Sequence, residues 1–112
     1  MAEIEKTEVM PGIVVCKLPD SLGQDTPQTF EKEMKEFVTS GKKRIVFDMQ
    51  DVTYVDSMWI GSLLRLNFAA REAGVQLRLS GLSLEIATEF RNVGMYKSFH
   101  VFPSVKEALA AE

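Results

Sequence analysis

Hydrophobic and polar positions along the chain follow two periods, one typical of strands and one typical of helices. Segments 13–18 and 44–49 are nearly continuous apolar runs of strand length, and the second is of the kind that is buried on both faces of a parallel sheet. Segment 75–79 alternates apolar with polar residues, and 99–102 forms a short last strand. A preceding strand within 4–9 could pair with 13–18. The pattern predicts about four to five strands.

Helical spacing of apolar residues predicts a helix after each strand from 13–18 onward. Thr26 as N-cap, followed by Pro27, begins a helix that ends at Ser40 and Gly41. The helix from Ser57 ends at Gly74; it is the most hydrophobic, so we expect it to be the most central in packing. The apolar positions are Phe30, Met34, Phe37 and Val38 in the first helix, Trp59, Leu63, Leu66, Ala70 and Ala73 in the second, Ile86, Phe90 and Val93 in the third, and Val105, Ala108 and Leu109 in the last, where Ser104 and Glu107 form a capping box.

The elements follow the order β-β-α-β-α-β-α-β-α, with a further extended segment at 52–55. Strands that alternate with helices favour right-handed crossovers and a mostly parallel sheet, so the fold class is α/β. We find no internal repeat and no linker. We therefore expect one domain over residues 1–112, with about four helices packed on the sheet.

Composition and charge narrow the possible functions. With 46% hydrophobic residues in 112, the chain can bury the core of one domain. The net charge of −3 argues against nucleic-acid binding, which needs a basic face, and we interpret the basic run 42–44 as the solvated start of a strand. No stretch approaches the roughly 18 to 20 apolar residues of a membrane-spanning helix, and no signal peptide is visible. Together with the single Cys16, these features lead us to expect a cytoplasmic location.

The side chains that catalysis would need are scarce. The chain has one histidine, His100, and one cysteine, Cys16, and it has neither a dinucleotide-binding glycine motif nor a P-loop. Asp48 and Asp56 lack a third acidic partner for a cation, so we interpret them as strand-end and capping residues. We expect no enzyme activity, no catalytic residue, no metal and no cofactor.

Ser57 stands directly before a helix, where its hydroxyl can cap free backbone N–H groups and where the helix dipole favours added negative charge. Phosphorylation there would add about −1.5 to −2 charge beside Asp56, which changes the surface much more than the fold. From position alone, the simpler interpretation is that Ser57 is an N-cap.

The segment 47–74, FDMQDVTYVDSMWIGSLLRLNFAAREAG, resembles the central signature of STAS domains, specifically the bacterial anti-sigma-factor antagonists. In that family, a strand of the form apolar-Asp-apolar precedes a second short strand, and Asp-Ser then opens a helix that has a nearby glycine and ends in a glycine. The matching residues of this chain are Asp48, Asp56, Ser57, Gly61 and Gly74. The resemblance extends over nearly the whole length.

The resemblance implies that Ser57 is a phosphoacceptor. Unphosphorylated antagonists of this family bind an anti-sigma factor that is also a serine kinase; phosphorylation ends the interaction, and a serine phosphatase restores it. Other STAS proteins are further candidate partners. The resemblance implies partner contacts at Asp56, Ser57, Met58, Gly61, Gly23 and Gln24, and structural roles for Asp48, Trp59 and Gly74.

Two positions depart from the familiar family form. Asp-Ser is usually followed by Ser or Thr and then Gly, whereas this chain has Met58 and Trp59, which resembles variant members of stress-signalling scaffolds. Gly23 stands where many antagonists carry an aspartate. Trp59 is equally compatible with core packing and with an exposed partner anchor, while Met58 is the more exposed of the pair. A scaffold or ligand-binding module in which Ser57 is never modified is the alternative function.

Overall fold

The computed structural model describes residues 4–20 and 26–111 and has the order of elements that the sequence predicts. The elements are β1 (Glu5–Met10), β2 (Ile13–Lys17), α1 (Pro27–Val38), β3 (Arg44–Asp48), α2 (Ser57–Glu72), β4 (Gln76–Ser80), α3 (Leu84–Asn92), the short 3-10 helix η2 (Tyr96–Ser98), β5 (His100–Phe102) and α4 (Val105–Ala110). The prediction of an α/β fold is confirmed.

The strands form a five-stranded sheet in the order β1-β2-β3-β4-β5. Strand β1 pairs antiparallel with β2, and each of the remaining neighbours is parallel, so the sheet is mostly parallel as predicted. The turn between β1 and β2 contains Gly12 at φ +81°, a left-handed conformation that favours glycine.

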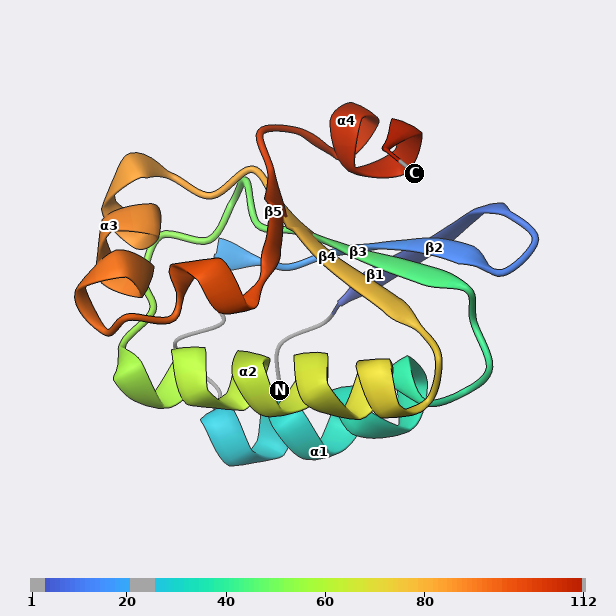
Figure 1. Cartoon of the computed structure of the whole chain (residues 1–112), viewed down its shortest axis with the longest axis horizontal. Helices are drawn as coiled ribbons and strands as arrows, with labels where there is room; N and C mark the ends of the chain where they lie inside the picture. The colour runs from blue at the N-terminus through green and yellow to red at the C-terminus, as the bar shows by residue number, and fades with distance from the viewer. Residues whose placement is uncertain (1–3, 21–25, 112) are drawn as a thin grey trace.

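Helices α1 and α2 lie side by side on one face of the sheet, and α4 covers the other face (Figure 1). On the α1–α2 side, the inward residues of the three central strands are buried: Val14, Cys16, Ile45, Phe47, Leu77 and Leu79. Helix α2 buries more residues than any other described helix, which agrees with its predicted central place in the packing.

Helix α4 is attached to the opposite face by hydrogen bonds to its last carbonyl groups. The guanidinium of Arg78, a residue only 5% exposed, donates to the carbonyls of Ala108 and Ala111, both at 2.6 Å. Arg44 donates to the carbonyl of Leu109 at 2.9 Å. Cations are favourable at a helix C-terminus because its unpaired carbonyls carry partial negative charge.

Residues 52–55, for which the sequence predicts extended backbone outside the order of strands, form no strand of the sheet. The amide of Val52 instead donates to the carbonyl of Met49 at 3.1 Å in a turn. The side chains of Val52 and Val55 are buried at 2% and 7% exposure. Apolar spacing therefore signalled core packing of a loop and not a strand.

The C-terminal end of α2 and the N-terminal end of α4 lie where the sequence predicts them. Helix α2 ends at the C-cap Ala73, and Gly74 follows it at φ +76°; Ala73 itself is exposed although the sequence places it on the apolar stripe. At α4, the amide of Glu107 donates to Ser104 Oγ at 3.3 Å, and the Ser104 hydroxyl donates to the Glu107 carboxylate at 3.2 Å. Ser104 is the N-cap, as predicted.

Candidate functional site

Asp56, and not Ser57, caps the N-terminus of α2. Its Oδ1 accepts a hydrogen bond from the amide of Trp59 at 3.0 Å, and its Oδ2 accepts from the hydroxyl of Tyr54 at 3.3 Å. The Asp56 carboxylate, with a smaller contribution from Glu89 on α3, raises the pKa of Tyr54. The interpretation of Ser57 as an N-cap is therefore wrong, because the residue before it already has a carboxylate in the capping position.

Ser57 is the first residue of α2, and its side chain is exposed. Within the described part of the chain, its hydroxyl has no hydrogen-bond partner, and neither do the amides of Ser57 and Met58. Free amides at this position are the ordinary consequence of a helix start. The hydroxyl is thus open to modification, and donors for an added anion lie directly beside it.

The two bulky residues after Ser57 point in opposite directions. Met58 is 56% exposed, whereas Trp59 is 3% exposed and packs edge-on against Phe30 of α1 with ring centroids 5.4 Å apart. Successive helix residues differ by about 100° around the axis, so one neighbour can face the core while the other faces solvent. Of the two alternatives for Trp59, core packing is confirmed and the exposed partner anchor is wrong.

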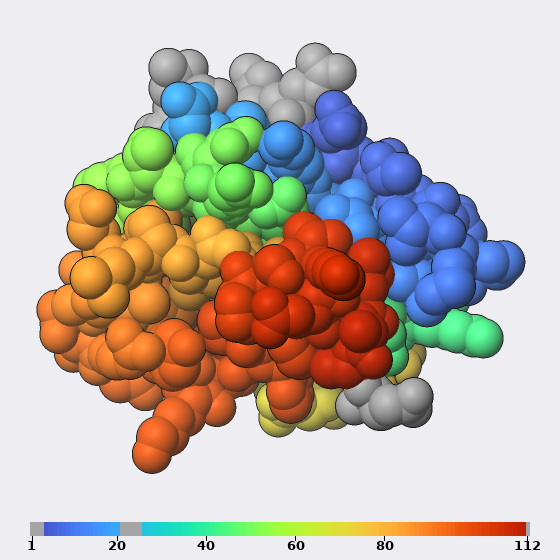
Figure 2. All heavy atoms as spheres, turned by 90° about the horizontal axis from the view of Figure 1, so that it is seen from above, coloured from blue at the N-terminus to red at the C-terminus, as the bar shows by residue number. Residues whose placement is uncertain are grey.

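Apolar side chains flank Ser57 on the outer surface. Tyr54 and Met58 are each 56% exposed, and we call the group Tyr54, Asp56, Ser57 and Met58 the Ser57 surface. Seen from above, the loop after β3, in green, lies on the same face as the β4–α3 connection, in orange (Figure 2). Exposed apolar side chains close to a serine in the sequence are compatible with a surface that another protein contacts.

The remaining residues predicted to contact a partner fall in two places. Gly61 lies one turn after Ser57, and a side chain added there would meet only Arg65 Nη1 at 3.6 Å, an ordinary contact. This chain's own packing therefore does not require a glycine at position 61. Gly23 and Gln24 lie outside the described residues.

Asp48 lies at the end of β3, where its Oδ1 accepts from the amide of Gln50 at 3.1 Å, in agreement with a strand-end role. Residues 4–20 and 26–111 contain no group of three or more His, Cys, Asp or Glu side chains that could hold a metal ion. Cys16 on β2 and His100 on β5 are separated by two strands, and burial raises the pKa of Cys16 to about 12. The structure does not bring these two residues together.

Tyr54 is a residue of the Ser57 surface that the sequence analysis missed. The signal for it was an aromatic residue two positions before an aspartate, and such a local pattern does not say which way either side chain points.

In the described part of the chain, no helix is long and apolar enough to cross a membrane.

The fold is that of an α/β module in which α1 and α2 cover one face of a mixed, mostly parallel sheet and α4 covers the other. Residues 6–108 match the STAS domain family. The chain therefore belongs to the STAS family, whose domains are typically non-catalytic regulatory modules.

One curated relative is solute carrier family 26 member 9 of Mus musculus, which is 29% identical over 101 residues. That match covers 84% of this chain but only 12% of the mouse protein, so this chain spans a small part of its relative's length.

Many solved structures resemble the fold, and RsbS and SpoIIAA are two examples. A serine-to-glutamate variant of RsbS from Moorella thermoacetica is 18% identical with a TM-score of 0.76, and the match covers 95% of this chain and 91% of that one. The anti-sigma factor antagonist SpoIIAA in its unphosphorylated form is 14% identical with a TM-score of 0.73, covering 96% of this chain and 93% of that one. These likenesses establish the shared fold.

Proposed function

We propose that this chain is an anti-sigma-factor antagonist whose binding surface is switched by phosphorylation of Ser57. The observation that carries the proposal is the exposed, unpartnered Ser57 hydroxyl at the start of α2, left free because Asp56 makes the cap. In its unphosphorylated form the Ser57 surface binds an anti-sigma factor that is also a serine kinase. Phosphorylation ends that interaction, and a serine phosphatase restores it. Membership of the STAS family and the likeness to SpoIIAA support this function.

Phosphate on Ser57 would change the surface without melting the helix. It would add about −1.5 to −2 charge where the helix dipole and the free amides of Ser57 and Met58 stabilise an anion. A partner that packs on Met58 and Tyr54 would have to desolvate this phosphate beside the Asp56 carboxylate. Because burying an unpaired charge is costly, the modified surface would lose its partner.

The other residues that the sequence predicts to contact a partner have the following roles in this proposal. Asp56 positions the turn, Met58 is the apolar contact beside Ser57, and Gly61, Gly23 and Gln24 are further residues that the partner contacts. The chain acts as one STAS domain, in the cytoplasm, through protein contacts with the kinase, the phosphatase and other STAS proteins, and neither by catalysis nor by binding nucleic acid.

The first test is phosphopeptide mapping of the tagged chain isolated from its native cells under several growth conditions, with co-purified proteins quantified in parallel. We expect phosphate on Ser57 that changes with condition. Ser57→Ala should keep its partner constitutively, and Ser57→Asp should lose it. Gln28→Glu is the matched control, since it adds one negative charge near the exposed start of α1 instead of α2, and it should bind as the unmodified chain does.

The alternative is a scaffold in which Ser57 is never modified, and the observation that favours it is Met58, whose exposed thioether stands where antagonists commonly carry Ser or Thr. Equal recovery of partners by Ser57→Ala and Ser57→Asp, with the Ser57 peptide well observed and never phosphorylated, would establish the scaffold and refute the switch.

A further inference from the structure

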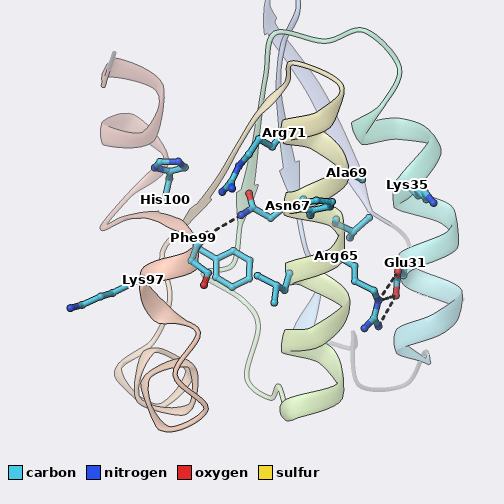
Figure 3. Close-up of a pocket in the computed structure, with 13 residues that line it drawn as sticks. Glu31, Lys35, Arg65, Asn67, Ala69, Arg71, Lys97, Phe99 and His100 are labelled. Atoms are coloured by element: carbon cyan, nitrogen blue, oxygen red, sulfur yellow. Dashed lines mark hydrogen bonds and ion pairs between the residues drawn. The ribbon is translucent and has the colours of Figure 1, made fainter.

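A groove with a volume of about 820 Å³ runs along the solvent-facing side of α2, beginning about two turns after Ser57. Its walls are α1 on one side and the segment from η2 to β5 on the other (Figure 3). Leu64 and Phe68 lie one turn apart on α2, and Phe68 is 60% exposed. A large aromatic side chain that lines a groove and is exposed to solvent is typical of an interaction surface and not of a core.

Three cations that form no ion pair among the described residues also line the groove. Lys35 lies on α1, Arg71 on α2 and Lys97 on η2, and among the described residues none of the three forms an ion pair. Figure 3 shows Lys35 and Lys97 on opposite sides of α2. This local excess of positive charge contrasts with the net charge of −3 for the whole chain.

The acidic residue that lines the groove is already engaged. Glu31 forms an ion pair with Arg65 at 2.9 Å, and this contact lowers the pKa of the Glu31 carboxyl. The hydroxyl of Ser62 on α2 also donates a hydrogen bond to the Glu31 carboxylate at 3.2 Å, which holds Glu31 of α1 close to α2. Lys35 also lowers the pKa of Glu31, by a smaller Coulombic contribution, but it forms no ion pair with it. The three cations can therefore meet acidic groups of another molecule.

We propose that this groove, which we call the α2 groove, binds an acidic amphipathic segment of a partner protein. Two apolar side chains of the segment, one helical turn apart, pack on Leu64 and Phe68, and acidic residues on both flanks meet Lys35, Arg71 and Lys97. This is the complementarity of a helix in a groove. A small anionic amphiphile carries one headgroup, which cannot reach cations on both walls at once.

The α2 groove is separate from the Ser57 surface, although both lie on α2. The first turn of the helix carries Ser57, and the groove begins with Leu64. A charge at position 57 should leave binding in the groove nearly unchanged, because exposed charges about 10 Å or more apart are largely screened at physiological salt. The α2 groove thus remains testable if the phosphoswitch fails.

The test is titration of the isotopically labelled full chain with a synthetic amphipathic peptide, followed by amide NMR. The peptide carries leucine and phenylalanine four positions apart with glutamates on both flanks, and a matched control peptide carries lysines in place of the glutamates. We expect shifts confined to residues lining the groove, binding of the acidic peptide alone, and weaker binding at high salt.

Variants of the chain locate the contact. Phe68→Asp, and the double change Lys35→Glu with Lys97→Glu, should each weaken binding at least about tenfold. Leu84→Asp and Lys106→Glu are matched controls, because they alter an exposed apolar residue and an exposed lysine away from the groove, and both should bind normally. Ser57→Asp should also bind normally.

The proposal is overturned if millimolar acidic peptide shifts no groove resonance, or if the lysine peptide binds equally well. Groove shifts with dodecanoate, without shifts from the peptide, would assign the groove to a small amphiphile instead. Concentration-dependent self-association in sedimentation that Phe68→Asp abolishes would assign it to a second copy of this chain and would likewise overturn the proposal.

Discussion

The two sides of α2 have opposite properties. The side facing the sheet is apolar and closed to solvent, with Trp59, Ile60, Leu63, Leu66 and Ala70 all buried. The solvent-facing side carries Ser57, Met58 and Phe68, all exposed. Because neighbouring positions on a helix face different directions, residues that hold the fold and residues free for recognition alternate within a single turn. Stability and binding should therefore be separable by single substitutions.

Trp59→Ala should give the largest loss of stability on the buried side. The indole packs against Phe30, which in turn packs against Phe47 of β3, so its removal leaves a cavity between α1, α2 and the sheet. We expect the free energy of unfolding, measured in urea, to fall by about 3 to 5 kcal/mol. A loss below about 1 kcal/mol would contradict the placement of Trp59 in the core.

The reactivity of Cys16, a buried residue of β2, measures how well the interface between the sheet and α2 excludes solvent. Burial raises its pKa from 9.0 to about 12, so the folded thiol stays protonated at pH 8 and alkylation by iodoacetamide should be at least about a hundredfold slower than in urea. The folded state also binds this proton more tightly than the unfolded state. The contribution of Cys16 to the free energy of unfolding should therefore be fully present below about pH 9 and be lost as the pH rises toward 12. Equal alkylation rates in buffer and in urea, followed by intact-mass measurement, would show that this side is open.

Asp56→Ala tests the N-cap of α2, at the point where the exposed Ser57 and Met58 precede the buried Trp59. Loss of the bond to the Trp59 amide should lower the free energy of unfolding by about 1 kcal/mol, whereas Asp56→Asn, which can still cap, should lower it less. Thermal and urea unfolding of both variants provide the measurement. Identical stability of the alanine variant and the original chain would mean that Asp56 does not cap α2 in solution.

Met58→Ala should have the smallest effect on stability. Its side chain is 56% exposed, so the free energy of unfolding should change by no more than about 0.5 kcal/mol in the same urea titrations. Recovery of a partner that depends on the state of Ser57 should nevertheless fall. A destabilisation comparable to that of Trp59→Ala would erase the difference between the two sides.

Sequence reasoning was most successful where structure follows local periodicity. It placed the strands and helices in the right order, and it predicted a capping role for Asp56 and core packing as one alternative for Trp59. It did not decide whether 52–55 belongs to the sheet, since buried valines in a loop produce the same apolar signal as a short strand. It was wrong about Ser57 as an N-cap, because adjacent aspartate and serine are both good capping residues and only the backbone decides which of them caps.

The sequence by itself determined the α/β order and the buried stripe of α2, because these depend on residues within a few turns of one another. The candidate phosphoacceptor came from the family resemblance and not from local periodicity. Tertiary structure alone decided that Trp59 packs against Phe30 of α1, and that Arg78 binds the end of α4. It alone assembled the α2 groove, whose lining residues come from α1, α2 and the segment from η2 to β5. Packing brings together side chains that are distant in the chain, and local sequence patterns do not predict these contacts.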